Sequence, residues 1–87
     1  MGFRFHVIDA DGKDTGEFLK EWDDEVTGVF AAIYYGKTLS LLEIEKLSKI
    51  FSQKRAEVIE KRDIEELELW LKFMQDSLKR GCSWECY

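Results

Sequence analysis

Two cysteines with a tryptophan between them, in the stretch "GCSWECY" at residues 81 to 87, are the first residues whose chemistry needs an explanation. In a helix the Cα atoms of Cys82 and Cys86 would lie about 6 Å apart, and in an extended strand about 13 Å apart. Only the compact conformation allows a disulfide between them. Because the stretch follows a glycine typical of a helix end, we expect a packed tail in which Trp84 and Tyr87 cover other parts of the fold. Oxidation of the two thiols in another compartment is the alternative role.

Metal binding and acid–base catalysis have few candidate residues. A zinc site needs about four ligands, whereas the chain offers two thiols and a single histidine, His6. His6 falls on the polar side of a predicted strand, where a surface residue is expected. An EF-hand calcium loop needs glycine at its sixth position and glutamate at its twelfth, and counting from Asp9 gives Asp14 and Lys20 instead. The sequence therefore predicts no metal, no cofactor and no enzymatic activity.

Length and composition predict one small globular domain over residues 1–87. Hydrophobic residues make up 45% of the chain, which excludes disorder, and charged residues make up 36%, which is typical of a hydrated surface. No apolar run reaches the roughly 20 residues that a membrane span needs, and the first residues lack the pattern of a secretion signal. We therefore expect a cytoplasmic protein that makes no contact with membranes.

The first part of the chain is predicted to form a β-hairpin. The stretch "FRFHVID" at residues 3–9 alternates apolar and polar side chains, as a strand with one buried face does. The Asp-Gly pair at 11–12 is a strong hairpin signal. A two-residue turn there would place Phe5 opposite Phe18 and Asp9 opposite Asp14, and the second pair is unfavourable without a cation or a longer loop.

Three helices are expected after the hairpin. The first begins near Asp23 and ends at Gly36, and its uncharged stretch 26–36 predicts a helix buried in the fold or in an interface. Ser40 and Glu43, and then Asp63 and Glu66, have the spacing of capping boxes that start the other two helices, and Gly81 ends the last one. The fold class is thus α+β, with an N-terminal β-hairpin (about 3–20) packed on three α-helices (about 23–35, 40–61 and 64–80).

The charge distribution favours a binding function. The net charge is −5, and all of it lies in residues 1–36, which carry eight acidic and three basic residues, whereas residues 37–87 carry ten of each. Direct binding to nucleic acid is disfavoured because the basic residues are interleaved with acidic ones. We expect a non-catalytic protein-binding module, a small acidic inhibitor or immunity-type protein like those of phages and mobile elements, which blocks a basic surface of its target. Its predicted contact residues, with an aromatic anchor among the acids, are Glu17, Glu21, Trp22, Asp23, Asp24 and Glu25.

The alternative hypothesis is a homo-oligomer that binds a small nucleotide-like anion. Tyrosine rings could stack on a base and a lysine could neutralise a phosphate, and the candidate residues are Tyr34, Tyr35 and Lys37. A homodimer could form through the N-terminal strand, whose edge would be unpaired in an isolated hairpin, or through the uncharged stretch 26–36.

Overall fold

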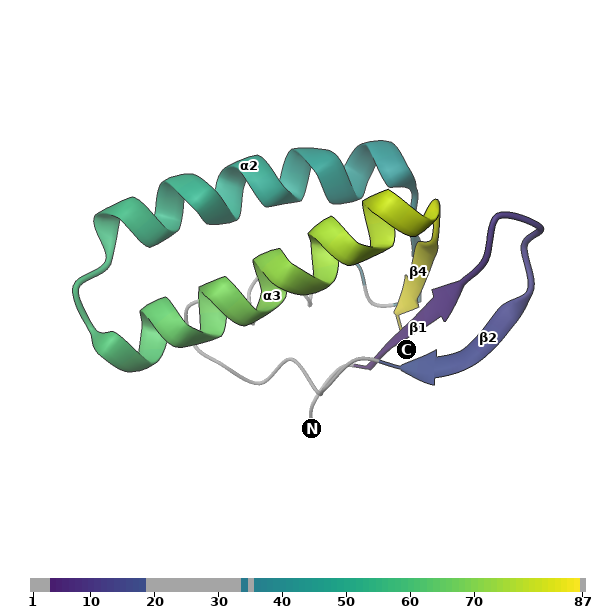
Figure 1. Ribbon diagram of the computed structural model, residues 1–87, viewed down its shortest axis with the longest axis horizontal. Helices are drawn as coiled ribbons and strands as arrows, with labels where there is room; N and C mark the ends of the chain where they lie inside the picture. Colours follow the sequence, from purple (N-terminus) through teal and green to yellow (C-terminus); the bar gives the residue numbers. More distant parts are fainter. Residues whose placement is uncertain (1–3, 19–33, 35, 87) are drawn as a thin grey trace.

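The computed structural model describes residues 4–18, 34 and 36–86, which form a four-stranded antiparallel sheet beside a hairpin of two helices (Figure 1). In chain order the elements are β1 (Phe5–Ile8), β2 (Asp14–Phe18), β3 (Thr38–Leu39), α2 (Leu41–Glu57), α3 (Lys61–Arg80) and β4 (Ser83–Cys86). The α+β class predicted from the sequence is correct. The prediction of a two-stranded hairpin packed on three helices is wrong, because the described residues form a larger sheet and two helices.

The stretch expected to be a packed tail is a central strand of the sheet. The strand order is β2-β1-β4-β3, so β4 is hydrogen-bonded on both sides. Trp84 lies opposite Val7 of β1 and opposite Leu39 of β3. Burial alternates along β4, with Trp84 and Cys86 buried and with Ser83 and Glu85 half-buried. This period-2 pattern is the signature of a strand with one face on the core.

The turn between β1 and β2 is longer than predicted. Asp9 and Lys13 close it, since the Asp9 N–H donates to the Lys13 carbonyl at 2.8 Å. Gly12 donates to the Asp9 carbonyl and has a φ of 83°, a left-handed conformation that glycine adopts without strain. Consequently Asp14 lies opposite Ile8 rather than opposite Asp9, and the unfavourable carboxylate pair of the two-residue turn is avoided.

The first helix of the helical hairpin, α2, begins where the sequence predicts it. The Ser40 hydroxyl accepts the N–H of Glu43, and the Glu43 carboxylate accepts the N–H of Ser40, which is the expected capping box. The helix ends at Glu57, however, and not near residue 61 as predicted. Val58 has an extended backbone and its side chain packs on the core, so the two β-branched residues Val58 and Ile59 leave the helix.

The second helix, α3, begins earlier than the capping-box spacing of Asp63 and Glu66 predicts. It starts at Lys61, with Glu60 as a cap residue that makes no side-chain capping bond. It ends as predicted at Gly81, whose φ of 72° is left-handed. Arg55 of α2 and Glu68 of α3 form an ion pair between the two helices, with the Arg55 Nε atom 2.8 Å from the carboxylate. Neither α2 nor α3 is long and apolar enough to cross a bilayer.

The helix predicted over residues 23–35 lies almost entirely outside the described residues. Within that range only Tyr34 is described, and it is helical. Gly36 has a φ of 76°, which is the left-handed conformation expected of it. Its N–H donates to the Cys86 carbonyl at 2.8 Å, so the chain joins the sheet directly after this glycine.

The core lies between the sheet and the helices, and three aromatic rings form its centre. The ring centroid of Trp70 on α3 lies 5.7 Å from that of Phe5 and 6.1 Å from that of Trp84. Phe5 and Trp84, on the neighbouring strands β1 and β4, are 5.5 Å apart. All three side chains are fully buried. The buried residues packed around them are Val7, Leu39, Ile44, Leu47, Phe51, Leu67, Met74, Cys82 and Cys86.

A buried hydrogen bond links β4 to α3 within this core. The Trp84 Nε1–H group donates to the Ser77 hydroxyl at 2.7 Å, and Ser77 is only 2% exposed. The N–H of Cys82 also donates to the Ser77 carbonyl, so the same residue holds the start of β4 against the end of α3. Since indole has a single polar atom, this one bond satisfies it.

Replacing Ser77 with alanine should lower the free energy of unfolding by about 1–3 kcal/mol, because the Trp84 N–H would stay buried without its acceptor. The measurement is urea denaturation followed by circular dichroism. Ser52→Ala on the exposed side of α2 is the matched control, and it should change stability by less than about 0.5 kcal/mol. Equal effects of the two substitutions would show that the hydrogen bond contributes nothing specific.

Candidate functional site

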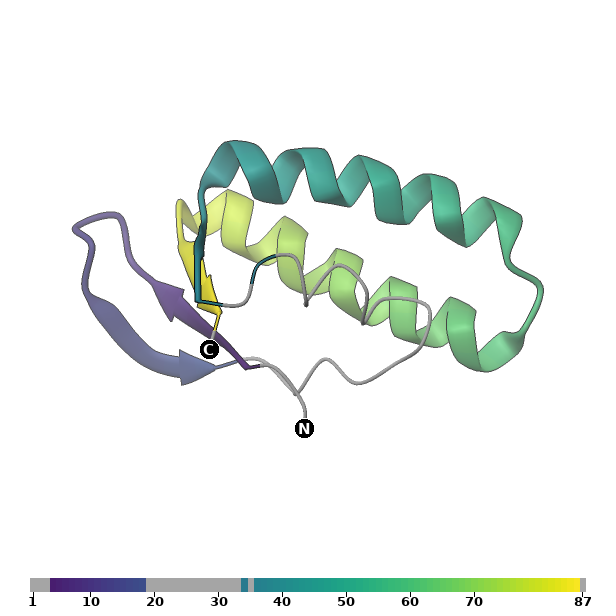
Figure 2. The same ribbon diagram turned by 180° about the vertical axis from the view of Figure 1, so that it is seen from behind.

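The β1–β2 hairpin carries a local excess of negative charge. Residues 9 to 17 contain four carboxylates, Asp9, Asp11, Asp14 and Glu17, and one cation, Lys13. Asp11, Asp14 and Glu17 are exposed, and Asp9 is half-buried. In Figures 1 and 2 the hairpin turn lies at the end of the molecule opposite the connection between α2 and α3. The hairpin therefore presents a negative surface at one end of the molecule, whereas the acidic and basic residues of positions 37–87 balance in number.

The side chain of Asp9 holds the turn of this hairpin in one conformation. Its Oδ1 atom accepts the N–H groups of Asp11 and Lys13, each at 2.9 Å. Such Asx-type bonds satisfy turn amides that would otherwise need water. The backbone that carries the exposed Asp11 carboxylate is therefore held by the Asp9 side chain.

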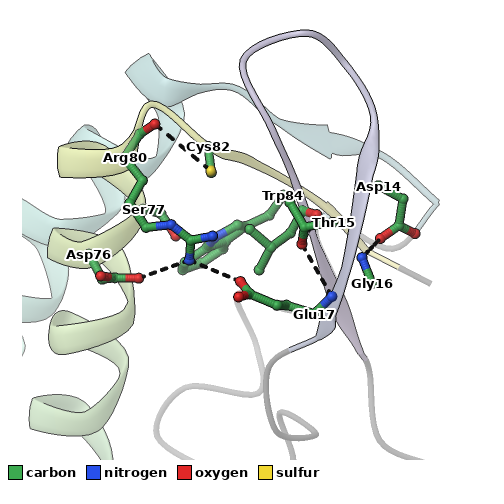
Figure 3. A network of polar contacts seen from close by, with 10 residues as sticks. Asp14, Thr15, Gly16, Glu17, Asp76, Ser77, Arg80, Cys82 and Trp84 are labelled. Atoms are coloured by element: carbon green, nitrogen blue, oxygen red, sulfur yellow. Dashed lines mark hydrogen bonds and ion pairs between the residues drawn. The ribbon is translucent and has the colours of Figure 1, made fainter.

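A bulge in β2 protects the outer edge of the sheet. Gly16 has a φ of 82°, and the pairing of β1 with β2 is irregular between His6 and Ile8. The Gly16 N–H donates to Asp14 Oδ1 at 2.8 Å, and the Glu17 N–H donates to the Thr15 hydroxyl at 3.2 Å (Figure 3). A bulge and charged side chains such as those of Asp14 and Glu17 make an edge strand a poor template for a further strand.

Strand addition to the N-terminal strand, the predicted route to a homodimer, has no free edge available. β1 is paired with β2 on one side and with β4 on the other. The prediction assumed an isolated hairpin, which the insertion of β4 rules out. The other predicted dimer contact, the uncharged stretch 26–36, lies outside the described residues except for Tyr34 and Gly36.

Glu17 connects the hairpin to the end of α3. The Arg80 guanidinium donates to the Glu17 carboxylate at 2.9 Å and to Asp76 at 3.3 Å (Figure 3). The hydrogen bond with Glu17 and then that with Asp76 raise the pKa of Arg80. Of the six predicted contact residues, Glu17 is the one that the structure describes, and its carboxylate forms an ion pair with Arg80. The other five, Glu21, Trp22, Asp23, Asp24 and Glu25, lie outside the described residues.

His6 lies on the polar face of the sheet, and the predicted pairing of Phe5 with Phe18 is wrong because Phe18 lies opposite His6. Its cross-strand partners are Phe18 on β2 and Glu85 on β4. The His6 Nδ1 atom is 3.6 Å from Asp14 Oδ2, and the histidine side chain is 25% exposed. The described residues of the chain include no group of three or more histidine, cysteine or acidic side chains that could hold a metal ion.

The three residues predicted for an anion pocket have different surroundings. Tyr34 is half-buried and packs against the core, and burial, followed by the charge of Glu43, raises the pKa of its hydroxyl. Lys37 is exposed, and its carbonyl accepts the N–H of Cys86 at 3.0 Å. Tyr35 lies outside the described residues. Tyr34 therefore has the packing role of a core residue.

The two cysteines are free thiols on the core side of the sheet. Cys82 and Cys86 are both buried and not joined to each other. Burial raises the pKa of the Cys86 thiol, which makes it a poor nucleophile in the folded protein. The alternation of Cys82, Trp84 and Cys86 with Ser83 and Glu85 is the sequence signal that could have predicted this strand.

Comparison of the chain with protein-family models, with curated proteins and with solved structures found no match.

Proposed function

We propose that this protein is a non-catalytic binding module that uses its acidic N-terminal part to bind a basic surface of another protein. The observation that carries the proposal is the concentration of exposed carboxylates on the β1–β2 hairpin, at one end of a molecule whose residues 37–87 are neutral. Opposite charges across an interface guide the two proteins together and suppress wrong partners. An inhibitor or immunity-type protein that covers a basic site works in this way.

Two structural features support recognition by the side chains of the hairpin. Asp9 holds the turn and Arg80 ties Glu17 to α3, so contacts within the chain restrict this part of the negative surface before a partner arrives. A surface whose groups are already restricted loses less conformational entropy on binding. The bulge at Gly16 disfavours recognition through a backbone edge, which leaves the carboxylates as the groups that a partner contacts.

Capture of a partner from a lysate of the source cells, at low and at high salt, is the first test. We expect a basic protein to be retained at low salt and released at high salt, since screened charges no longer attract. Retention that is independent of salt, or the absence of any basic partner at low salt, would contradict the proposal.

Charge variants then locate the surface. Asp11→Lys should lower the association rate with the captured partner by about 3- to 10-fold at low salt and reduce its salt dependence. Glu57→Lys at the end of α2 is the matched control, because it gives the same net charge at an exposed site outside the hairpin. Stopped-flow or surface plasmon resonance measures both rates. Equal slowing by the two variants would assign the effect to total charge and not to the hairpin.

A further inference from the structure

Cys82 and Cys86 lie on either side of Trp84, and in the native fold they are too far apart to form a disulfide with each other. Both thiols and the indole are at most 4% exposed and face the same core. Cys86 belongs to β4, which is paired on both sides, and Cys82 directly precedes this strand, where its N–H donates to the Ser77 carbonyl. Within β4, Ser83 lies opposite Ile8 and Cys86 lies opposite Phe5. The backbone through Ser83, Trp84 and Glu85 is therefore fixed in the extended conformation.

The separation of the two cysteines follows from this conformation. At about 3.3 Å per residue, the Cα atoms of Ser83 and Cys86 at the ends of β4 lie about 10 Å apart. Cys82 is buried like Trp84 and Cys86 and continues the alternation of the strand, which gives a separation of about 13 Å between the two cysteines. A disulfide needs Cα atoms about 4.4–6.8 Å apart. Bringing them this close requires residues 82–86 to fold into a tight turn, in which the strand no longer exists.

Loss of the strand would remove more than one element. β1 and β3 both pair with β4, so the sheet would separate into the β1–β2 hairpin and an unpaired β3. Trp84 would leave the aromatic cluster with Phe5 and Trp70, and its hydrogen bond to Ser77 would break. Fully burying one large aromatic residue already contributes a large part of the stability of a domain of this size.

We propose that the Cys82–Cys86 disulfide and the native fold exclude each other, so that the redox state of this pair is a switch between a folded and an unfolded protein. In the oxidation, the two thiols lose two protons and two electrons to a small-molecule disulfide such as oxidised glutathione. A mixed disulfide forms first, the second thiol attacks it, and two glutathione thiols are released while one S–S bond forms in the chain. This inference does not depend on the proposed binding function.

The folded state protects the same pair from oxidation. Both thiols are buried, and burial raises the pKa of Cys86 and so lowers the fraction of reactive thiolate. Because β4 is central, exposing the thiols means breaking two ladders, which approaches global unfolding. Oxidation should therefore follow the population of the unfolded chain, and the coupling is reciprocal, since a disulfide formed in that chain prevents refolding.

The test uses the full chain unfolded in urea with oxidised glutathione, followed by purification of the species whose mass is lower by two hydrogens. After removal of urea we expect this species to lack the near-ultraviolet circular dichroism of packed tryptophans, and to regain it when dithiothreitol is added. Regain of dichroism by reduction serves as the internal control, because the same molecules then fold. A native spectrum in the purified disulfide form, without reductant, would overturn the proposal.

A second arm measures the rate of disulfide formation in native buffer and in rising urea. We expect oxidation in native buffer to be at least about 100-fold slower than in the unfolded chain, with the rate rising along the unfolding curve. The double variant Cys82→Ala, Cys86→Ala is the control for damage by the oxidant, and its unfolding curve should be unchanged after the same treatment. Rapid disulfide formation in native buffer with no loss of structure would also overturn the proposal.

Discussion

Deleting residues 82–87 should abolish folding. The deletion removes β4, the strand to which β1 and β3 are both hydrogen-bonded, and it removes Trp84 from the core. It also removes the N–H of Cys82 that caps the Ser77 carbonyl at the end of α3. The free energy of unfolding of a small domain is only about 5–15 kcal/mol. We expect the loss of the sheet pairing and of the Trp84 packing together to exceed it.

The measurement for this deletion is far- and near-ultraviolet circular dichroism with thermal and urea unfolding. We expect partial helical signal, no near-ultraviolet tryptophan signal and no cooperative transition. Glu85→Gln in the full chain is the control, because Glu85 is half-buried on the polar side of the same strand, and it should unfold cooperatively. A truncated protein with a cooperative transition at the wild-type midpoint would show that β4 is dispensable.

Trp70→Ala should lower the free energy of unfolding by about 3–5 kcal/mol, the usual range for removing a fully buried tryptophan. Trp70 packs edge-on against Phe5 and Phe73 and also contacts Trp84, so alanine leaves a cavity at the junction of sheet and helices. Its Nε1–H group donates to Glu66 at 3.1 Å, and that bond is lost as well.

Urea titration monitored at 222 nm measures this loss. Gln75→Ala on the exposed side of α3 is the matched control and should stay within about 0.5 kcal/mol of the wild type. The loss of unfolding free energy for Trp70→Phe should lie between those of Trp70→Ala and Gln75→Ala, since phenylalanine keeps part of the ring contact. A loss below about 1 kcal/mol for Trp70→Ala would mean that the core closes around the missing ring.

The features predicted correctly from the sequence are those set by local contacts. The capping box of Ser40 and Glu43 begins α2, and Gly81 ends α3, because each depends on residues within one helical turn. The strand at Phe5–Ile8 follows from alternation along its own length. The end of α2 was predicted wrongly because Val58 packs on the core from an extended backbone, and this tertiary contact is not part of the local pattern.

The central strand could not be predicted with the same ease. Ser83 pairs with Ile8, so the partners are far apart in the sequence, and no local signal specifies that pairing. The alternation of Cys82, Trp84 and Cys86 is short and follows a helix cap, where a tail is the usual expectation. Within the acidic site, the carboxylates were evident from composition, whereas the ion pair of Glu17 with Arg80 depends on the fold.

The insertion of β4 between β1 and β3 has a consequence for protein synthesis. The hairpin of β1 and β2 leaves the ribosome long before residues 83–86 are made, and its apolar residues Phe5 and Val7 then lack the strand that covers their other edge. Contacts between such distant segments form slowly, and unpaired strand edges promote aggregation in the meantime. The nascent chain should therefore lack its native sheet and core until residue 86 has emerged, and chaperones that bind exposed aromatic segments could bind it in this interval.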